Sequence, residues 1–129
     1  MRLLLKDNLP FTEVILNYRG VEIKIPDVLI DTGSASAILA AHLVAEAGIK
    51  PEMTDILYTI RGVGGTEAVF SRQVDSLQVG SSTVTDFEIE IGGMDYGFEI
   101  NGILGMDYML RAGMIIDLNA ISLEFPLRP

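Results

Sequence analysis

The chain of 129 residues suits one domain, residues 1–129, that buries an adequate core without disulfides or a metal. It has 9 basic and 18 acidic residues, and this net charge of −9 argues against nucleic acid and anionic membranes as partners. Cysteine is absent, which excludes thiol catalysis and fits a reducing compartment, so we expect a cytoplasmic protein. No apolar run approaches the ~20 residues that span a bilayer, and the first residues do not match a signal peptide.

Alternation of polar and apolar residues predicts an antiparallel hairpin near the start of the chain. Residues 12–18 and 21–25 form its strands, and Arg19-Gly20 forms its turn. Pro26-Asp27 is expected to break the pairing. The apolar run Val28-Leu29-Ile30 then predicts a short strand that is buried on both faces.

The spacing of apolar residues next becomes helical and predicts a helix over residues 38–47 that ends at Gly48. The single histidine, His42, would lie on the surface of this helix. Residues 56–61 and 67–74 are β-prone and predict a hairpin with a glycine-rich tip, and residues 73–79 predict a further strand.

The last third of the chain predicts one more alternating strand, a short helix and a closing hairpin. Residues 86–91 place three acids on one face of the strand, where they could bind calcium, although such faces are more often simply solvated. Residues 106–112 predict a helix closed by Gly113, and residues 114–125 predict the hairpin. The expected fold is therefore mostly β with two short helices.

Several common sites are excluded by their missing residues. Gly62-Val63-Gly64-Gly65 begins like a dinucleotide-binding fingerprint, but Glu67 replaces the third glycine and no helical pattern follows. The sequence contains no Gly-Lys-Ser/Thr phosphate loop and no Gly-x-Ser-x-Gly motif around Ser34 or Ser36.

The strongest candidate site is Asp31-Thr32-Gly33-Ser34, which directly follows the buried run 28–30. A buried carboxylate is costly unless it is hydrogen-bonded or neutral. Gly33 lets backbone amides approach the carboxylate, and the hydroxyls of Thr32 and Ser34 are spaced to brace it. The pattern fits a positioned acid, and it fits equally well an N-cap for the following helix.

In its context this motif resembles the active-site segment of aspartic proteases. Residues 28–35 match that segment, and Ile103-Leu104-Gly105 before a short helix matches the apolar-apolar-glycine segment of the same family. The hairpin with its glycine-rich tip lies between them, where the family has its flap. The order of these motifs is similar to that of retropepsin-like proteases, and in particular of the single-domain bacterial type.

The resemblance implies a retropepsin-like closed β-barrel that works as a homodimer without cofactor or metal. It implies an aspartic endopeptidase that acts on peptide or protein substrates, with one Asp31 from each chain in the paired carboxylates. Thr32 would join the two turns, and Ser34 would hold the outer carboxylate oxygen. The implied catalytic residues are Asp31, Thr32, Gly33 and Ser34, and the implied substrate-binding residues are Gly62, Val63, Gly64, Gly65, Ile103, Leu104 and Gly105.

The chain departs from the retroviral pattern after the apolar-apolar-glycine segment. The arginine found there in retroviral enzymes is absent, and Asp107 stands nearby. Two other functions remain open at this point. One is a dimerisation or peptide-binding module of the same fold with little or no turnover, and the other is a calcium-binding β domain that uses Asp86, Glu88 and Glu90.

Overall fold

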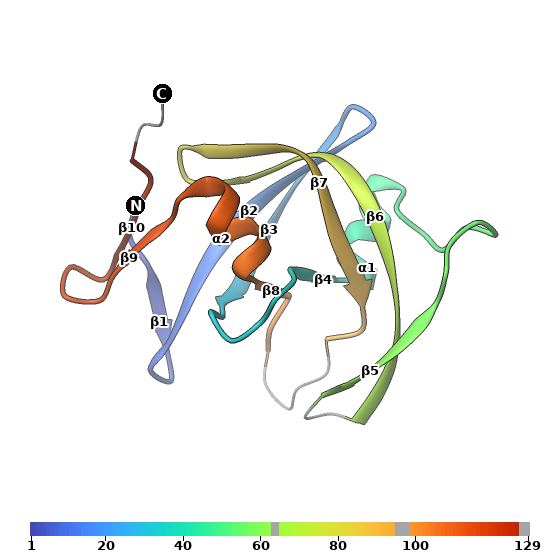
Figure 1. The fold of residues 1–129 in the computed structure, drawn as a ribbon, viewed down its shortest axis with the longest axis horizontal. Helices are drawn as coiled ribbons and strands as arrows, with labels where there is room; N and C mark the ends of the chain where they lie inside the picture. Colours follow the sequence, from blue (N-terminus) through green and yellow to red (C-terminus); the bar gives the residue numbers. More distant parts are fainter. Residues whose placement is uncertain (63–64, 95–98, 127–129) are drawn as a thin grey trace.

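The computed structural model describes residues 1–62, 65–94 and 99–126, without the side chains of residues 59–68. Within these residues the chain is mostly β with two short α-helices and one 3-10 turn (Figure 1). The elements are β1 (Leu4–Lys6), β2 (Leu9–Tyr18), β3 (Val21–Ile30), β4 (Ile38–Ala40), α1 (Ala41–Val44), η1 (Ala45–Ala47), β5 (Tyr58–Gly62), β6 (Gly65–Val79), β7 (Ser82–Gly92), β8 (Gly102–Leu104), α2 (Met106–Ala112), β9 (Ile115–Asp117) and β10 (Ser122–Glu124).

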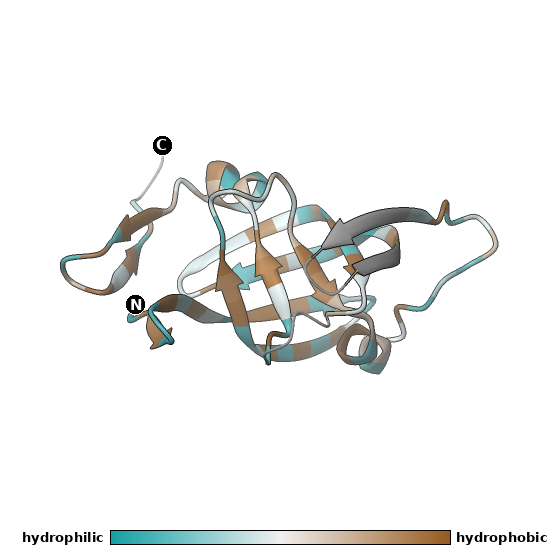
Figure 2. Cartoon of the chain, turned by 90° about the horizontal axis from the view of Figure 1, so that it is seen from below, coloured by the Kyte–Doolittle hydropathy of each residue, from teal (hydrophilic) through white to brown (hydrophobic). Residues whose placement is uncertain are grey.

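Eight strands form one sheet in the order β1-β2-β3-β8-β4-β7-β6-β5. Strand β2 also pairs with β6, so the pairings run in a cycle from β2 through β3, β8, β4, β7 and β6 back to β2. Hydrophobic and hydrophilic residues alternate along the longer strands (Figure 2). The faces that carry the buried residues, among them Val14, Leu16 and Leu77, form the hydrophobic core.

The predicted first hairpin is confirmed as β2 and β3, with positive φ at both Arg19 and Gly20, as a tight hairpin turn requires. The expected break at Pro26-Asp27 is wrong. Strand β3 continues through these residues by a bulge, in which the register shifts between Thr12 and Val14 of β2 and Asp27 takes a positive φ. The bulge lets one strand carry both the hairpin and the buried run before Asp31.

The predicted helix over residues 38–47 is wrong in its first part. Residues 38–40 are strand β4, which pairs in parallel with β7 and antiparallel with β8. All three of its residues are buried, so backbone pairing on both edges overrides the helical spacing of the sequence. Only α1 and η1 are helical, and they end at Gly48 with φ +86°, as expected. His42 is exposed on α1.

Strands β6 and β7 form the longest hairpin. The sequence predicted two strands over residues 67–79, and this division is wrong because β6 is one strand of 15 residues. The alternation predicted for β7 is confirmed, with Phe87, Ile89 and Ile91 buried and Asp86 and Glu88 exposed. The two strands keep one register from Phe70 opposite Ile91 to Val79 opposite Ser82.

The two ends of the chain pair with each other within one subunit. The Met1 amino group donates to Leu123 O at 3.1 Å, and the Leu123 amide donates to Met1 O at 2.8 Å. The Leu3 amide donates to Ile121 O at 3.0 Å, and both leucines are buried. In Figure 1 the N-terminus accordingly lies beside the β9–β10 hairpin. This hairpin confirms the one predicted over residues 114–125.

Tyr108 fixes α2 against the sheet. Its ring is fully buried and lies edge-on to Phe87, with the ring centroids 5.8 Å apart. Its hydroxyl donates to Ser82 O at 2.9 Å and accepts the Val79 amide at 3.1 Å, at the turn between β6 and β7. Burial raises the pKa of this phenol, so the hydroxyl keeps its proton and both bonds.

Tyr108→Phe should lower the free energy of unfolding by about 1–3 kcal/mol, because it leaves the Val79 amide without its partner in a buried place. Denaturant unfolding measures this change. Tyr58→Phe is the matched control, because Tyr58 is exposed and its hydroxyl makes only a long bond of 3.4 Å to Ser71 Oγ. This change should lower the free energy of unfolding by less than about 0.5 kcal/mol. Equal effects of the two changes would contradict the role given to Tyr108.

Candidate active site

Asp31 is the first residue after β3, and its position is set by the neighbouring strand β8. The two strands pair in parallel, Leu29 with Ile103 and Ile30 with Leu104. The Asp31 amide continues this ladder by donating to Leu104 O at 3.1 Å. The predicted motif and the predicted apolar-apolar-glycine segment are therefore brought together at the end of the same strand pair.

One backbone amide bonds to the Asp31 carboxylate, and a second amide closes the turn on the Asp31 carbonyl. The Gly33 amide donates to Asp31 Oδ1 at 2.9 Å, and the Ser34 amide donates to Asp31 O at 3.1 Å. A Cβ on residue 33 would lie 3.2 Å from Oδ1, so glycine fits this tight turn best. The amide part of the predicted cradle is confirmed.

The side chains of the motif are arranged differently from the prediction. The Ser34 hydroxyl donates to Ser36 O at 2.8 Å, so the expected brace on the Asp31 carboxylate is not made within the single chain. Thr32 is exposed.

The alternative role of Asp31 or Ser34 as a helix N-cap is wrong. No helix begins after the motif, because β4 follows it. The N-cap of α1 is Ala40, which makes no side-chain capping bond. The carboxylate of Asp31 is therefore not committed to helix capping, and it is half-buried at the surface of the loop.

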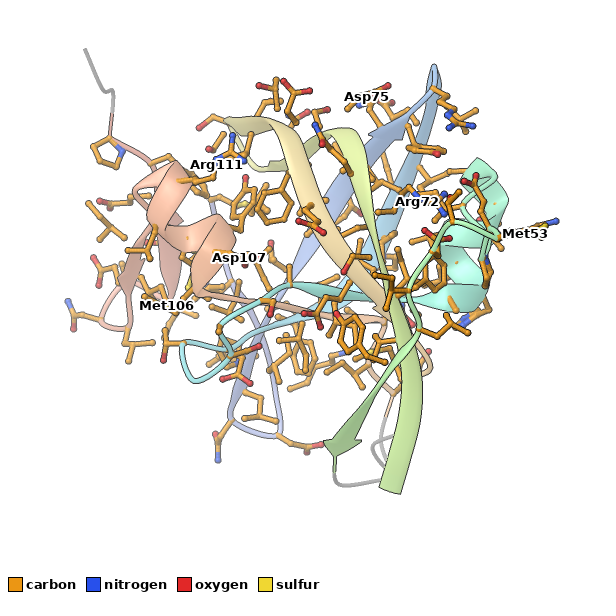
Figure 3. The ribbon with its side chains drawn as sticks, turned by 45° about the vertical axis from the view of Figure 1, so that its right-hand side comes forward. Met53, Arg72, Asp75, Met106, Asp107 and Arg111 are labelled. Atoms are coloured by element: carbon orange, nitrogen blue, oxygen red, sulfur yellow. The ribbon has the colours of Figure 1, made fainter. Side chains whose placement is uncertain are left out.

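The segment from β8 into α2 runs directly against the loop that contains Asp31. A Cβ on Gly105 would lie 2.6 Å from both the carbonyl carbon and the oxygen of Ser36. The Met106 amide donates to Ser34 O at 2.8 Å, and the Asp107 amide donates to Ala35 O at 3.2 Å. Figure 3 shows Met106 and Asp107 at the beginning of α2, beside this loop.

The other predicted residues of the apolar-apolar-glycine segment lie beneath the loop. Leu104 is 1 % exposed and belongs to the core, whereas Ile103 is half-buried between β3 and β4. A Cβ on Gly102 would lie 2.8 Å from Ile38 O, so the segment also fits closely against β4. Leu104 and Gly105 thus support the loop and do not line an open surface.

The predicted glycine-tipped hairpin is present as β5 and β6, with Gly62 paired to Gly65. Val63 and Gly64 lie outside the described residues. The hairpin projects from the body of the sheet (Figure 1).

The base of this hairpin is fixed by Arg72 of β6. Its guanidinium lies 2.6 Å from Asp55 Oδ2 and donates to Lys50 O at 3.1 Å and to Tyr18 Oη at 3.3 Å. Burial lowers the pKa of Arg72, but the bonds to Tyr18 and Asp55 outweigh it and raise the pKa overall. Arg72 thus joins the segment before β5 to the sheet (Figure 3).

A cavity of about 500 Å³ lies between the loop, β7 and α2. Its lining includes Ser36, Glu88, Glu90, Asp107 and Arg111. The sequence predicted the shared face of Glu88 and Glu90, but it did not predict that this face meets the loop over residues 31–37. That contact depends on the parallel pairing of β4 with β7.

Tyr58 lies at the start of the projecting hairpin, and its hydroxyl lies 3.4 Å from the hydroxyl of Ser71, a residue that lines the cavity. Burial raises the pKa of its phenol, and the carboxylates of Glu90 and Glu88 raise it further. Tyr58 therefore remains a neutral hydrogen-bonding group near the hairpin base.

Metal ligands do not converge in the described parts of the chain. No group of three or more histidine, cysteine, aspartate or glutamate side chains there is placed to hold a metal ion. Asp86, Glu88 and Glu90 are all described, so the calcium alternative has no ligand set.

Among the described helices, none has the length and apolar character that spanning a bilayer requires.

Comparison with known proteins agrees with this geometry. The model of the aspartyl protease family matches residues 14–108, which include Asp31, the paired glycines of the hairpin and Gly105. The chain belongs to this family. A search of curated proteins found no significant match.

Two solved structures show the same fold at low sequence identity. A retropepsin-like aspartic protease from Rickettsia conorii superposes with a TM-score of 0.63 at 19% identity, covering 88% of each chain. The retroviral protease-like domain of a protein from Leishmania major gives a TM-score of 0.61 at 18% identity, covering 93% of this chain and 90% of that one. The fold of this family member is thus retropepsin-like.

Gly105→Ala should displace the loop over residues 31–37, because the new methyl group would meet backbone atoms of Ser36 that cannot rotate away. We expect shifted amide NMR signals over residues 31–37 and a loss of about 3 kcal/mol in the free energy of unfolding. Gly48→Ala is the control, since its methyl group would meet open space and would cost only the left-handed backbone, about 1–2 kcal/mol. Unchanged loop signals in Gly105→Ala would contradict the close contact.

Proposed function

We propose that the protein is an aspartic endopeptidase that acts as a homodimer. The observation that carries the proposal is the carboxylate of Asp31, held by the Gly33 amide at the end of the β3–β8 pair in a member of the aspartyl protease family. Its proposed substrates are peptides or proteins.

The chemistry needs two carboxylates at one site. One acts as a general base on water while the other donates a proton toward the carbonyl of the peptide bond. Two such groups a few ångströms apart share one proton, because like charges at that distance do not both ionise easily. The carboxylate that is ionised draws a proton from water as the water attacks, and the other carboxyl protonates the developing oxyanion.

One chain supplies half of this site. The sequence contains a single Asp-Thr-Gly, at residues 31–33. A twofold homodimer would bring two copies of Asp31 together at its axis. In that dimer Thr32, which is exposed in the single chain, would be free to meet its symmetry mate.

The surface beside Asp31 is suited to such contact. Phe11 pairs with Leu29, so the turn between β1 and β2 lies at the same end of the sheet as Asp31. The strand ends beside this turn carry Leu5 and Leu9 on opposite faces of the β1–β2 ribbon, and the two residues are 46% and 38% exposed. We propose that these leucines are covered by the second copy.

The remaining parts of the proposal concern the shape and setting of the enzyme. The cyclic order of strand pairings supports a closed barrel, and the projecting β5–β6 hairpin supports a flap that closes over an extended peptide. The lack of cysteine supports a reducing compartment such as the cytoplasm.

A catalytically silent dimerisation or peptide-binding module is the second candidate. It is favoured by one observation, the Ser34 hydroxyl that bonds to Ser36 O and leaves one side of the Asp31 carboxylate without its brace. Digestion of a peptide library at acid pH, with and without pepstatin, separates the two candidates. Cleavage that pepstatin blocks supports the enzyme, and intact peptides support the silent module.

Asp31→Asn should reduce cleavage by about 10²–10⁴-fold or more, because an amide neither takes the proton from water nor returns it. The dimer should persist, since the Asn oxygen still accepts the Gly33 amide. Peptide digestion and light scattering measure the two properties. Asp117→Asn, in the distant β9–β10 turn, is the control and should leave both unchanged. Cleavage retained in Asp31→Asn would sink the proposal.

Leu5→Glu together with Leu9→Glu should weaken the dimer, because each subunit would bring two unpaired charges to a buried contact. Sedimentation velocity should show monomer, and cleavage should recover as protein concentration rises. Leu118→Glu is the matched control, because Leu118 is 67% exposed but lies in the β9–β10 hairpin. If the control dissociates equally, or the double variant stays dimeric, the contact surface lies elsewhere.

A further inference from the structure

The paired carboxylates leave Asp107 without a role, although its side chain reaches the catalytic loop. Asp107 is half-buried in the first turn of α2. Its Oδ2 accepts the Ala37 amide at 3.1 Å, and its Oδ1 accepts the Tyr108 amide at 2.8 Å. One carboxylate therefore joins the helix to the point where the loop becomes β4.

The Ala37 amide depends on this partner. Ala37 has no exposed surface, so water does not readily replace a lost acceptor. A buried amide without a partner carries the full cost of its desolvation. The loop would have to move to satisfy the amide if the carboxylate were removed.

The bonds that join the backbone of the loop to the backbone of β8 and α2 do not depend on a side chain. Its entry is fixed by the Asp31 amide on Leu104 O, and its middle by the amides of Met106 and Asp107 on Ser34 O and Ala35 O. Any residue at these positions except proline would make the same bonds. The contact at the exit of the loop is the one that the identity of residue 107 decides.

We infer that Asp107 is a positioning residue for the proposed cleavage. Its carboxylate fixes the exit of the loop over residues 31–37, and the fixed loop sets the direction in which Asp31 and its amide cradle face the second subunit. This inference rests on the proposed function. It assigns to Asp107 no contact with substrate or with the reacting atoms.

The side-chain chemistry predicts which replacement restores the function. Asparagine keeps one oxygen that accepts the Ala37 amide, but its NH₂ group does not accept the Tyr108 amide. Alanine keeps neither bond. The order of loop rigidity is therefore aspartate, then asparagine, then alanine.

The experiment compares Asp107→Ala, Asp107→Asn and the control Asp117→Ala in the full-length protein. Asp117 Oδ1 accepts the Ala120 amide at 2.9 Å, so the control removes a similar carboxylate–amide bond far from the loop. We expect Asp107→Ala to lower kcat by about 10- to 100-fold with KM within about twofold, because misplaced catalytic groups cost rate more than binding. Asp107→Asn should recover most of kcat, and Asp117→Ala should match the unaltered protein.

Amide hydrogen exchange supplies a readout that does not need turnover. Asp107→Ala should speed exchange at Ala37 and Gly33 while the β2–β3 hairpin keeps its rates. Equal losses in the alanine and asparagine variants, or faster exchange throughout the sheet, would overturn the inference in favour of general stability. If the unaltered protein shows no cleavage that depends on Asp31, the proposed function fails, and exchange still decides whether Asp107 orders the loop.

Discussion

The insertion of β8 between β3 and β4 is the constraint on which the rest of the structure depends. Strand β8 is parallel to β3 and antiparallel to β4, and it carries the chain from there directly into α2. Glycines at both ends permit this, since side chains at Gly102 and Gly105 would collide with the backbone of Ile38 and Ser36. The same short segment therefore joins the sheet, positions Asp31 and leads into the helix that supports the loop over residues 31–37.

The backbone polar groups of the loop over residues 31–37 are hydrogen-bonded to neighbouring elements. The Leu104 carbonyl of β8, two amides of α2 and the carboxylate of Asp107 bond to backbone groups of residues 31–37, and the Gly33 amide is left to face the Asp31 carboxylate. Such preorganisation lets a carboxylate act without a loop rearrangement at each turnover. One chain holds one such carboxylate, so the proposed activity needs a second chain.

Acidic residues line the cavity beside the loop over residues 31–37. The chain has a net charge of −9, and Glu88, Glu90 and Asp107 line the cavity beside the loop. Arg111 is the basic side chain on that wall, and its guanidinium donates to Thr85 O at 2.8 Å. The negative charge of the cavity lining attracts cationic groups and repels anionic groups that approach the loop through the cavity.

Local patterns in the sequence predicted the Arg19-Gly20 turn, the alternation of β7 and the helix before Gly113, because each depends on residues close together in the chain. The glycines of the Asp31 turn and of the β8–α2 junction predicted the candidate site for the same reason. The sequence did not predict β4, the bulge at Pro26-Asp27 or the bond from Asp107 to Ala37. Strand β4 and the Asp107 bond depend on partners more than 50 residues away, such as Glu90 and Ile103 beside Ile38. The bulge depends on a β2–β3 ladder that tolerates one extra residue. The sequence by itself thus determined the chemistry of the site, and the tertiary structure decided its geometry, because backbone pairing on both edges of a buried strand outweighs local helical spacing.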